Sequence, residues 1–256
     1  MKTTSVISYI SNWLKSYAKS CYSHGFVIGI SGGIDSALTS TLAARTGLPL
    51  ICLEMPIHQE KKQVERAQKH IKWLKKNFSN VKSEKMELST IFDEFIKKIP
   101  SQKKHELALV NTRARLRMTT LYYFAQANNS LVLGTGNKVE DFGIGFFTKY
   151  GDGGVDISPI ADLLKSEVYK LAKELAIHDD IINAPPTDGL WGDDKTDEDQ
   201  IGANYPELEW AMNFDGDESI LLDREKEVLN IYKKFNHANQ HKMTSIPVCI
   251  IPKKLK

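Results

Sequence analysis

A short apolar segment that leads directly into two adjacent glycines is the feature that most restricts how this chain can fold. Residues 26–30 (FVIGI) have the length and composition of a buried parallel strand. Ser31-Gly32-Gly33-Ile34-Asp35-Ser36 follows at once, and residues 36–46 are expected to form a helix that Gly47 and Pro49 end. A strand, a glycine turn and a helix in this order predict a βα unit of a parallel sheet.

The same alternation continues along the chain. Further strands are expected at 50–53, 81–88 and 131–133, and helices at 4–18, 60–78, 91–99, 105–127 and 161–175. This pattern predicts an α/β fold, a doubly wound parallel sheet with helices on both faces. A chain of 256 residues is long enough for one large domain and short for two, so residues 1–256 are expected to form a single domain.

The composition changes between residues 183 and 218, where Pro, Gly and Asp crowd together. A long irregular segment in a compact domain is usually functional or disordered. We therefore expect a lid at 185–218, carrying Thr187 and Trp191, before helical spacing returns at 219–235.

Charge and cysteine usage exclude several classes of protein. A net charge of +2 gives no reason to expect nucleic acid or an anionic membrane as a partner. No apolar run approaches the roughly 18 residues that span a bilayer. Cys21, Cys52 and Cys249 lie far apart, which argues against a zinc site and suits a reducing compartment. The sequence predicts a cytoplasmic protein.

The glycine turn at residues 31–36 is suited to phosphate. Adjacent glycines let the backbone approach a ligand closely, and the free amides at a helix start attract anions. Ser31 and Ser36 add hydroxyl donors, while Asp35 beside a polyphosphate implies a bridging cation such as Mg²⁺. The alternative is an ordinary turn in which Asp35 or Ser36 caps the helix. No Gly-Lys-Ser/Thr follows, so the turn is not a Walker A loop.

The turn resembles the S-G-G-x-D-S loop of the N-type ATP pyrophosphatases, which have an adenine nucleotide alpha hydrolase-like fold. The second half of the chain resembles the ammonia-dependent NAD synthetases within that group. The resemblance covers roughly residues 27–247 and rests on segments 114–118 (ARLRM), 133–140 (LGTGNKVE), 145–156 (GFFTKYGDGGVD), 157–160 (ISPI), 164–165 (LK), 185–187 (PPT) and 241–242 (HK). Segment 141–144 is one residue longer than in some members of the family.

This resemblance implies an enzyme that amidates deamido-NAD with free ammonia. ATP is the co-substrate and Mg²⁺ the metal, the products are NAD, AMP and pyrophosphate, and an adenylated intermediate lies between them. The resemblance also implies a homodimer. Glutamine-dependent relatives carry a separate amidase domain, for which this chain has no room.

The resemblance assigns roles to individual residues. Positions matching the ATP site are Gly29, Ile30, Ser31, Gly32, Gly33, Ile34, Asp35, Ser36, Thr135, Lys165 and Thr187. Positions matching the deamido-NAD site are Arg115, Lys149, Asp156, His241 and Lys242. Asp35 and Glu140 match the metal ligands, and the expected catalytic set is Asp35, Lys165, Asp152 and Thr187, with Asp152 near the ammonium.

Taken singly, these residues have ordinary explanations. Surface arginines, a lysine in the first turn of a helix and aspartates in a glycine-rich turn would look the same. Two other functions remain as alternatives. An enzyme of this fold that acts on tRNA should carry a cysteine pair or a basic appended domain, and neither is present. A non-catalytic adenine-nucleotide-binding module would not need Asp35, Glu140 and Lys165 together.

Overall fold

The computed structural model describes residues 1–100, 105–185 and 196–256. Four strands pair in parallel in the order β3-β2-β1-β4. They are β1 (Gly25–Gly29), β2 (Leu50–Glu54), β3 (Val81–Lys85) and β4 (Ser130–Val132). The α/β fold predicted from the sequence is therefore confirmed.

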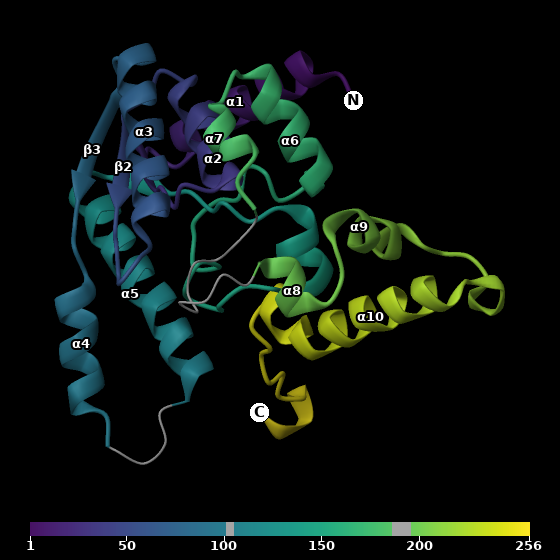
Figure 1. The fold of residues 1–256 in the computed structure, drawn as a ribbon. Helices are drawn as coiled ribbons and strands as arrows, with labels where there is room; N and C mark the ends of the chain where they lie inside the picture. Colours follow the sequence, from purple (N-terminus) through teal and green to yellow (C-terminus); the bar gives the residue numbers. More distant parts are fainter. Residues whose placement is uncertain (101–104, 186–195) are drawn as a thin grey trace.

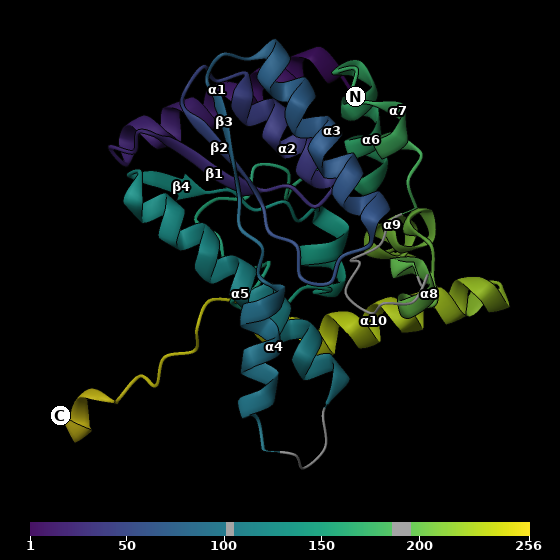
Figure 2. The ribbon, with the colours of Figure 1, turned by 60° about the vertical axis from the view of Figure 1, so that its left-hand side comes forward.

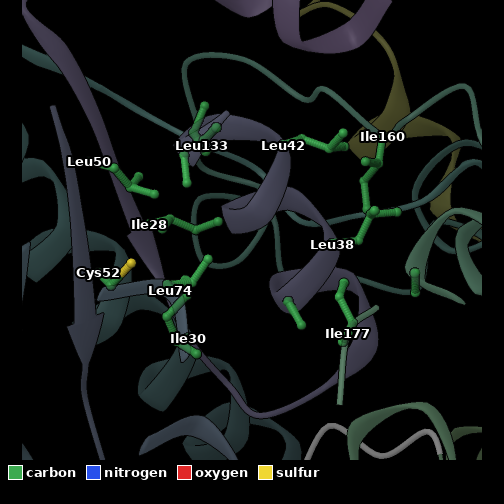
Figure 3. Close-up of a cluster of buried hydrophobic side chains, with 14 of the residues drawn as sticks. Ile28, Ile30, Leu38, Leu42, Leu50, Cys52, Leu74, Leu133, Ile160 and Ile177 are labelled. Atoms are coloured by element: carbon green, nitrogen blue, oxygen red, sulfur yellow. The ribbon is translucent and has the colours of Figure 1, made fainter. Parts of the chain in front are cut away.

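Helices cover both faces of this sheet because successive side chains of a strand point to opposite sides. On one face Phe26 and Ile28 of β1 pack with α1 (Thr3–Ser20), α2 (Ile34–Ala44), α3 (Lys61–Asn77), α6 (Lys165–Glu174) and α7 (Asp179–Ile182). Figure 3 shows Ile28 between Cys52 of β2 and Leu38 and Leu42 of α2 in this core.

The apolar core on the opposite face of the sheet is smaller. Val27 of β1 and Leu53 of β2 point to this side, where they pack with Phe92 and Ala125. Phe92 lies on α4 (Ser89–Lys98) and Ala125 on α5 (Glu106–Ala127). Both helices extend below the sheet in Figure 2. The predicted coverage of both faces is correct.

The remaining elements form a layer beside the sheet (Figure 1). They are a π-helix, η1 (Lys138–Ile144), then α8 (Asp197–Ile201), α9 (Tyr205–Asn213), the 3-10 helix η2 (Glu218–Ile220), α10 (Asp223–Met243) and the 3-10 helix η3 (Lys253–Leu255). Val139, Ile144, Leu208, Val228 and Leu229 are buried together there. This second apolar cluster joins η1 to the C-terminal helices.

The prediction of irregular structure across 183–218 is wrong for much of that range, because α8 and α9 lie within it. Both helices begin with reciprocal caps, Thr196 with Asp199 and Asn204 with Glu207. Asp197 and Asp199, which belong to the acidic part of that range, lie in the first turn of α8, and Pro206 lies in the first turn of α9. Thr187 and Trp191 lie outside the described residues.

Element boundaries differ from the prediction at several ends. The helix predicted at 161–175 begins only at Lys165, where Glu167 caps the Leu164 amide. The strand predicted at 81–88 ends at Lys85, and α10 continues past residue 235 to Met243. Among the described residues, no helix is long and apolar enough to cross a membrane.

Candidate active site

The site lies where the strand order reverses. The chain proceeds from β1 to β2 and β3 on one side, and then crosses to β4 on the other side of β1. In such sheets the ligand crevice lies beyond the carboxyl ends of the strands at this switch. The loops after β1 and β4 meet there, and the Asn137 side-chain amide donates to Asp35 Oδ1 at 3.2 Å.

The glycine turn after β1 has the geometry that phosphate binding needs. Gly32 has φ +86°, and a Cβ on it would lie 2.7 Å from the Gln63 carbonyl oxygen. A side chain at this position would therefore both strain the backbone and collide with α3. The Ser36 hydroxyl accepts the Ser31 amide at 3.3 Å and donates to the Gly33 carbonyl at 3.0 Å. These two hydrogen bonds close the turn on itself.

Helix α2 begins at Ile34, so its unpaired amides and the positive end of its dipole face the turn. The Arg66 guanidinium donates to the Gly32 carbonyl at 3.3 Å, which ties α3 to the loop. The predicted ATP-phosphate residues 29–36 thus run without a break from the end of β1 through the turn into the first turn of α2. Thr135, also predicted for ATP, is half-buried in the loop after β4.

Three charged side chains meet beside this turn. Lys165 Nζ donates to Asp35 Oδ2 at 2.6 Å and to Glu140 Oε1 at 2.9 Å. The exposed fractions of the three side chains are 4% for Lys165, 17% for Asp35 and 18% for Glu140. The structure therefore joins the two predicted metal ligands and the predicted catalytic lysine in one cluster, from α2, η1 and α6.

Burial and mutual attraction set the charges in this cluster. Burial alone would lower the pKa of Lys165, but the two carboxylates raise that pKa above its usual value. Burial opposes ionisation of Glu140 as well, yet the Lys165 ammonium holds the pKa of this carboxyl below its usual value. Lys165 therefore keeps its positive charge and pairs with both carboxylates.

The cluster fits a magnesium site that a substrate completes. The oxygens of Asp35 and Glu140 converge on a single cation, the Lys165 ammonium, and hard oxygen ligands are those that Mg²⁺ prefers. Within the part of the chain that the structure describes, no group of three or more His, Cys, Asp or Glu residues could hold a metal. Two carboxylates plus substrate phosphates are a usual ligand set for Mg²⁺.

Two residues of the cluster were not assigned from the sequence. Asn137 accepts the amides of Val139 and Glu140 and so caps η1, a role that its position before a helix could have indicated. The Tyr205 hydroxyl donates to Glu140 Oε1. Tyr205 gave no signal, because it lies inside the segment that was predicted to be irregular.

Glu140 is carried by a π-helix, whose turns are wider than those of an α-helix. The π-helix ends at Gly145, with φ 62°, and the Phe146 amide returns to the Glu140 carbonyl at 2.8 Å. Glu140 thus lies on the π-helix with its carboxylate facing Lys165.

Side chains of α10 cap the last carbonyls of this π-helix. The Asn236 and Asn239 amides donate to the Gly143 and Ile144 carbonyls at 2.7 and 2.8 Å. Lys242 Nζ donates to the carbonyls of Gly145 at 2.9 Å and Phe147 at 2.8 Å. The three side chains follow one face of α10, and Lys242, predicted to hold deamido-NAD, here supports the site backbone.

Of the other residues predicted for deamido-NAD, three lie together. The Arg115 guanidinium donates to the Lys149 carbonyl at 3.3 Å, and Lys149 Nζ donates to the His241 carbonyl. Asp156 instead accepts the Val132 amide at 2.8 Å and the Tyr122 hydroxyl at 3.0 Å. Its carboxylate holds the end of β4.

Asp152 is held in the turn that follows η1. Its carboxylate accepts the Thr148 amide at 3.0 Å, and the Thr148 hydroxyl donates to Asn111 Oδ1 at 2.7 Å. Neighbouring protein atoms exclude water from this carboxyl and raise its pKa above the usual value, although the residue as a whole is solvent-exposed.

Comparisons with known proteins identify the family of this chain. The NAD synthase family model matches residues 6–246. An NH3-dependent NAD synthetase of Syntrophomonas wolfei is 36% identical over the whole of both chains. The solved NMN synthetase of Francisella tularensis has a TM-score of 0.86 at 31% identity, and 99% of each chain is covered. The NH3-dependent NAD synthetase of Campylobacter jejuni has a TM-score of 0.79 at 31% identity, covering 98% of this chain and all of that one. This chain therefore belongs to the NAD synthase family.

Proposed function

We propose that this chain converts deamido-NAD, ATP and free ammonia into NAD, AMP and pyrophosphate. The observation that carries the proposal is the Asp35–Lys165–Glu140 cluster, which lies beside a prefolded turn suited to phosphate. As a ligase of the NAD synthase family, the chain needs such a set to break a phosphoric anhydride bond.

The reaction has two steps, and an adenylate joins them. An oxygen of the nicotinate carboxylate attacks the α-phosphorus of ATP, and the bond to pyrophosphate breaks. The nitrogen of ammonia then attacks the carbonyl carbon of the adenylate, the bond to AMP breaks, and a proton is released. Holding the carboxylate and ATP together provides much of the rate, because the two anions do not meet productively in free solution.

The chain's own residues neutralise the charge of the phosphates. The amides at the start of α2 and the hydroxyls of Ser31 and Ser36 would bind phosphate oxygens. Lys165 would turn from its carboxylates towards the leaving pyrophosphate. Asp35 and Glu140 would hold Mg²⁺, which when bound stabilises developing negative charge on those oxygens.

Arg115, Lys149, Asp156, His241 and Lys242 are proposed for the dinucleotide substrate. Arginine and lysine suit its pyrophosphate bridge, and Arg115 and Lys149 already lie together. Nicotinic acid mononucleotide is a second candidate substrate, because the Francisella tularensis structure is that of an NMN synthetase. Both substrates present the same nicotinate carboxylate to the cluster.

Asp152 and Thr187 complete the proposed catalytic set. Asp152 would hold ammonium near the adenylate, since an ionised carboxylate attracts a cation. Thr187 would contact ATP from the lid proposed at residues 185–218, which would exclude water from the reactive adenylate. Thr135 would contribute to the ATP site from the loop after β4.

We propose a cytoplasmic homodimer. Helix α1 buries Ile10 and Leu14 against the core, yet leaves three aromatic side chains exposed on its other side, Tyr9, Trp13 and Tyr17. Exposed aromatic groups of this kind favour protein contacts. Sedimentation equilibrium should give the mass of a dimer, and replacing Tyr9 and Trp13 with serine should give a monomer.

The product decides the function. The purified chain should be incubated with ATP, Mg²⁺ and ammonium, with deamido-NAD in one reaction and nicotinic acid mononucleotide in another. Mass spectrometry should detect an amide that is about one mass unit lighter than the acid, with AMP and pyrophosphate in equal amounts. Pyrophosphate release without an amide, or no release with either acid, would contradict the proposal.

A further inference from the structure

Tyr205 contacts both an anion and a cation of the cluster, and the proposed function has not used it. The residue is 5% exposed and is the first residue of α9. Its hydroxyl donates to Glu140 Oε1, and Lys165 Nζ lies 4.7 Å from the centre of its ring. One side chain thus reaches the carboxylate through its hydroxyl and the ammonium through its ring.

The backbone of Tyr205 is fixed where the side chain enters the site. Its amide donates to Glu198 Oε1 at 3.0 Å. Immediately before it, Asn204 caps α9, accepting the Glu207 amide at 2.9 Å while Glu207 accepts the Asn204 amide at 2.9 Å. These bonds hold the backbone of Tyr205, and the contacts with Glu140 and Lys165 hold its side chain.

Glu140 Oε1 receives two donors at once, the Tyr205 hydroxyl and the Lys165 ammonium. A buried tyrosine hydroxyl needs a partner, and a backbone carbonyl would have satisfied it. Here the partner is a carboxylate that the reaction uses, so the hydroxyl restricts how the carboxylate can rotate. The ring face also attracts the ammonium, which limits the positions of Lys165.

We propose that Tyr205 is a positioning residue that sets the orientation of the Glu140 carboxylate for ATP cleavage, and that its ring holds the Lys165 ammonium beside this carboxylate before the metal binds. This inference rests on the proposed function. It predicts that removing the hydroxyl alone impairs the chemical step, although the residue touches neither reacting bond. Losing one hydrogen bond to a charged group corresponds to a loss in kcat of about tenfold to a hundredfold.

The test compares Tyr205→Phe with Tyr232→Phe, a control on α10 that packs in the same apolar cluster. Tyr205→Phe should lower kcat by about tenfold to a hundredfold, leave KM for deamido-NAD nearly unchanged, and keep the urea midpoint of the native chain. Tyr232→Phe should keep the native kcat. A purely structural role would instead lower the midpoint of Tyr205→Phe and leave its kcat native, which would overturn the proposal.

A second measurement does not depend on turnover. Calorimetric titration with Mn²⁺ and ATP, without deamido-NAD, should show weaker binding to Tyr205→Phe than to the native chain, and weaker still to Tyr205→Leu, which also lacks the ring. Native affinity in both variants would overturn the positioning role. If the native chain forms no amide, the proposed function fails, and this titration still decides the role of Tyr205.

Discussion

Lys165 Nζ lies 2.6 Å from Asp35 Oδ2, although 130 positions of sequence separate the two residues. Each of these charges would be costly to bury alone, and together with Glu140 they compensate one another. The pair joins the start of α6 to the start of α2. The ammonium thus occupies the place between two carboxylates where a metal cation is expected during the reaction.

Replacing either carboxylate should abolish turnover while the fold is kept. In Asp35→Ala and Glu140→Ala, Lys165 still has one carboxylate partner, so no buried charge is left alone. Each variant should show native circular dichroism and less than about a hundredth of native kcat, because a metal ligand is lost. Native activity in either variant at saturating Mg²⁺ would refute the metal assignment.

Removing the ammonium should have two opposite effects. Lys165→Met leaves two buried carboxylates without their cation, so the free energy of unfolding should fall by about 3 kcal/mol without metal. The same variant should bind Mn²⁺ more tightly than the native chain in the absence of ATP, because the ammonium no longer competes. Electron paramagnetic resonance of free Mn²⁺ measures this, with Lys170→Met, an exposed lysine of the same helix, as control. Weaker Mn²⁺ binding by Lys165→Met would show that the two cations do not share a place.

The nitrogen source should be free ammonia. Glutamine should not replace ammonium, because among the described residues Cys21 and Cys249 are exposed and Cys52 is a buried thiol whose pKa burial raises to about 12. None of the three is suited to act as an amidase nucleophile. NAD formation should also rise with pH as ammonium loses its proton, until another group titrates. Efficient synthesis from glutamine by the purified chain would disprove this.

ATP and deamido-NAD should protect the segment at 185–218 from proteases. The proposed lid contains Thr187, and closing it over the adenylate would shield its backbone. Limited proteolysis with and without ATP, Mg²⁺ and deamido-NAD measures the effect, and Thr187→Ala should weaken it. Equal cleavage rates in the two conditions would rule the lid out.

His70 should make stability depend on pH below neutrality. Burial lowers its pKa to about 4, and Ser40 holds the neutral ring at 2.9 Å. The unfolded chain, with an ordinary histidine pKa, binds this proton first, so the stabilisation is complete above pH 6.5 and is lost as pH falls towards 4. The loss is about 3 kcal/mol. Urea unfolding at pH 7 and pH 4.5 should show a smaller difference for His70→Gln than for the native chain; the same difference in both would contradict the assignment.

The sequence predicted the parts of the site that depend on local signals. The strand at 26–30, its glycine turn and the helix after it could be predicted because each depends on nearby residues. The strand follows from an apolar run, the turn from the backbone freedom of glycine, and the helix from its capping residues. The charged residues Asp35, Glu140 and Lys165 were assigned by resemblance. Only the fold brings Lys165 Nζ within 2.9 Å of an oxygen of each carboxylate.

The missed features have physical causes as well. Helices α8 and α9 are short and rich in cap residues, so their composition reads as a loop. The π-helix follows neither a strand period nor the usual helical period, which hides it from pattern analysis. Tyr205 contacts Glu140 across 65 positions, and nothing local to it indicates that contact.

The caps that α10 places on the π-helix determine the order in which the site can be assembled. Asn236, Asn239 and Lys242 reach carbonyls that lie 93 to 97 positions earlier in the chain. During synthesis the turn at 31–36 can form once β1 and α2 have left the ribosome, whereas the carbonyls at the end of η1 gain these partners only after α10 has followed. A nascent chain therefore completes the two halves of the candidate site at different times, the glycine turn first and the capped π-helix last.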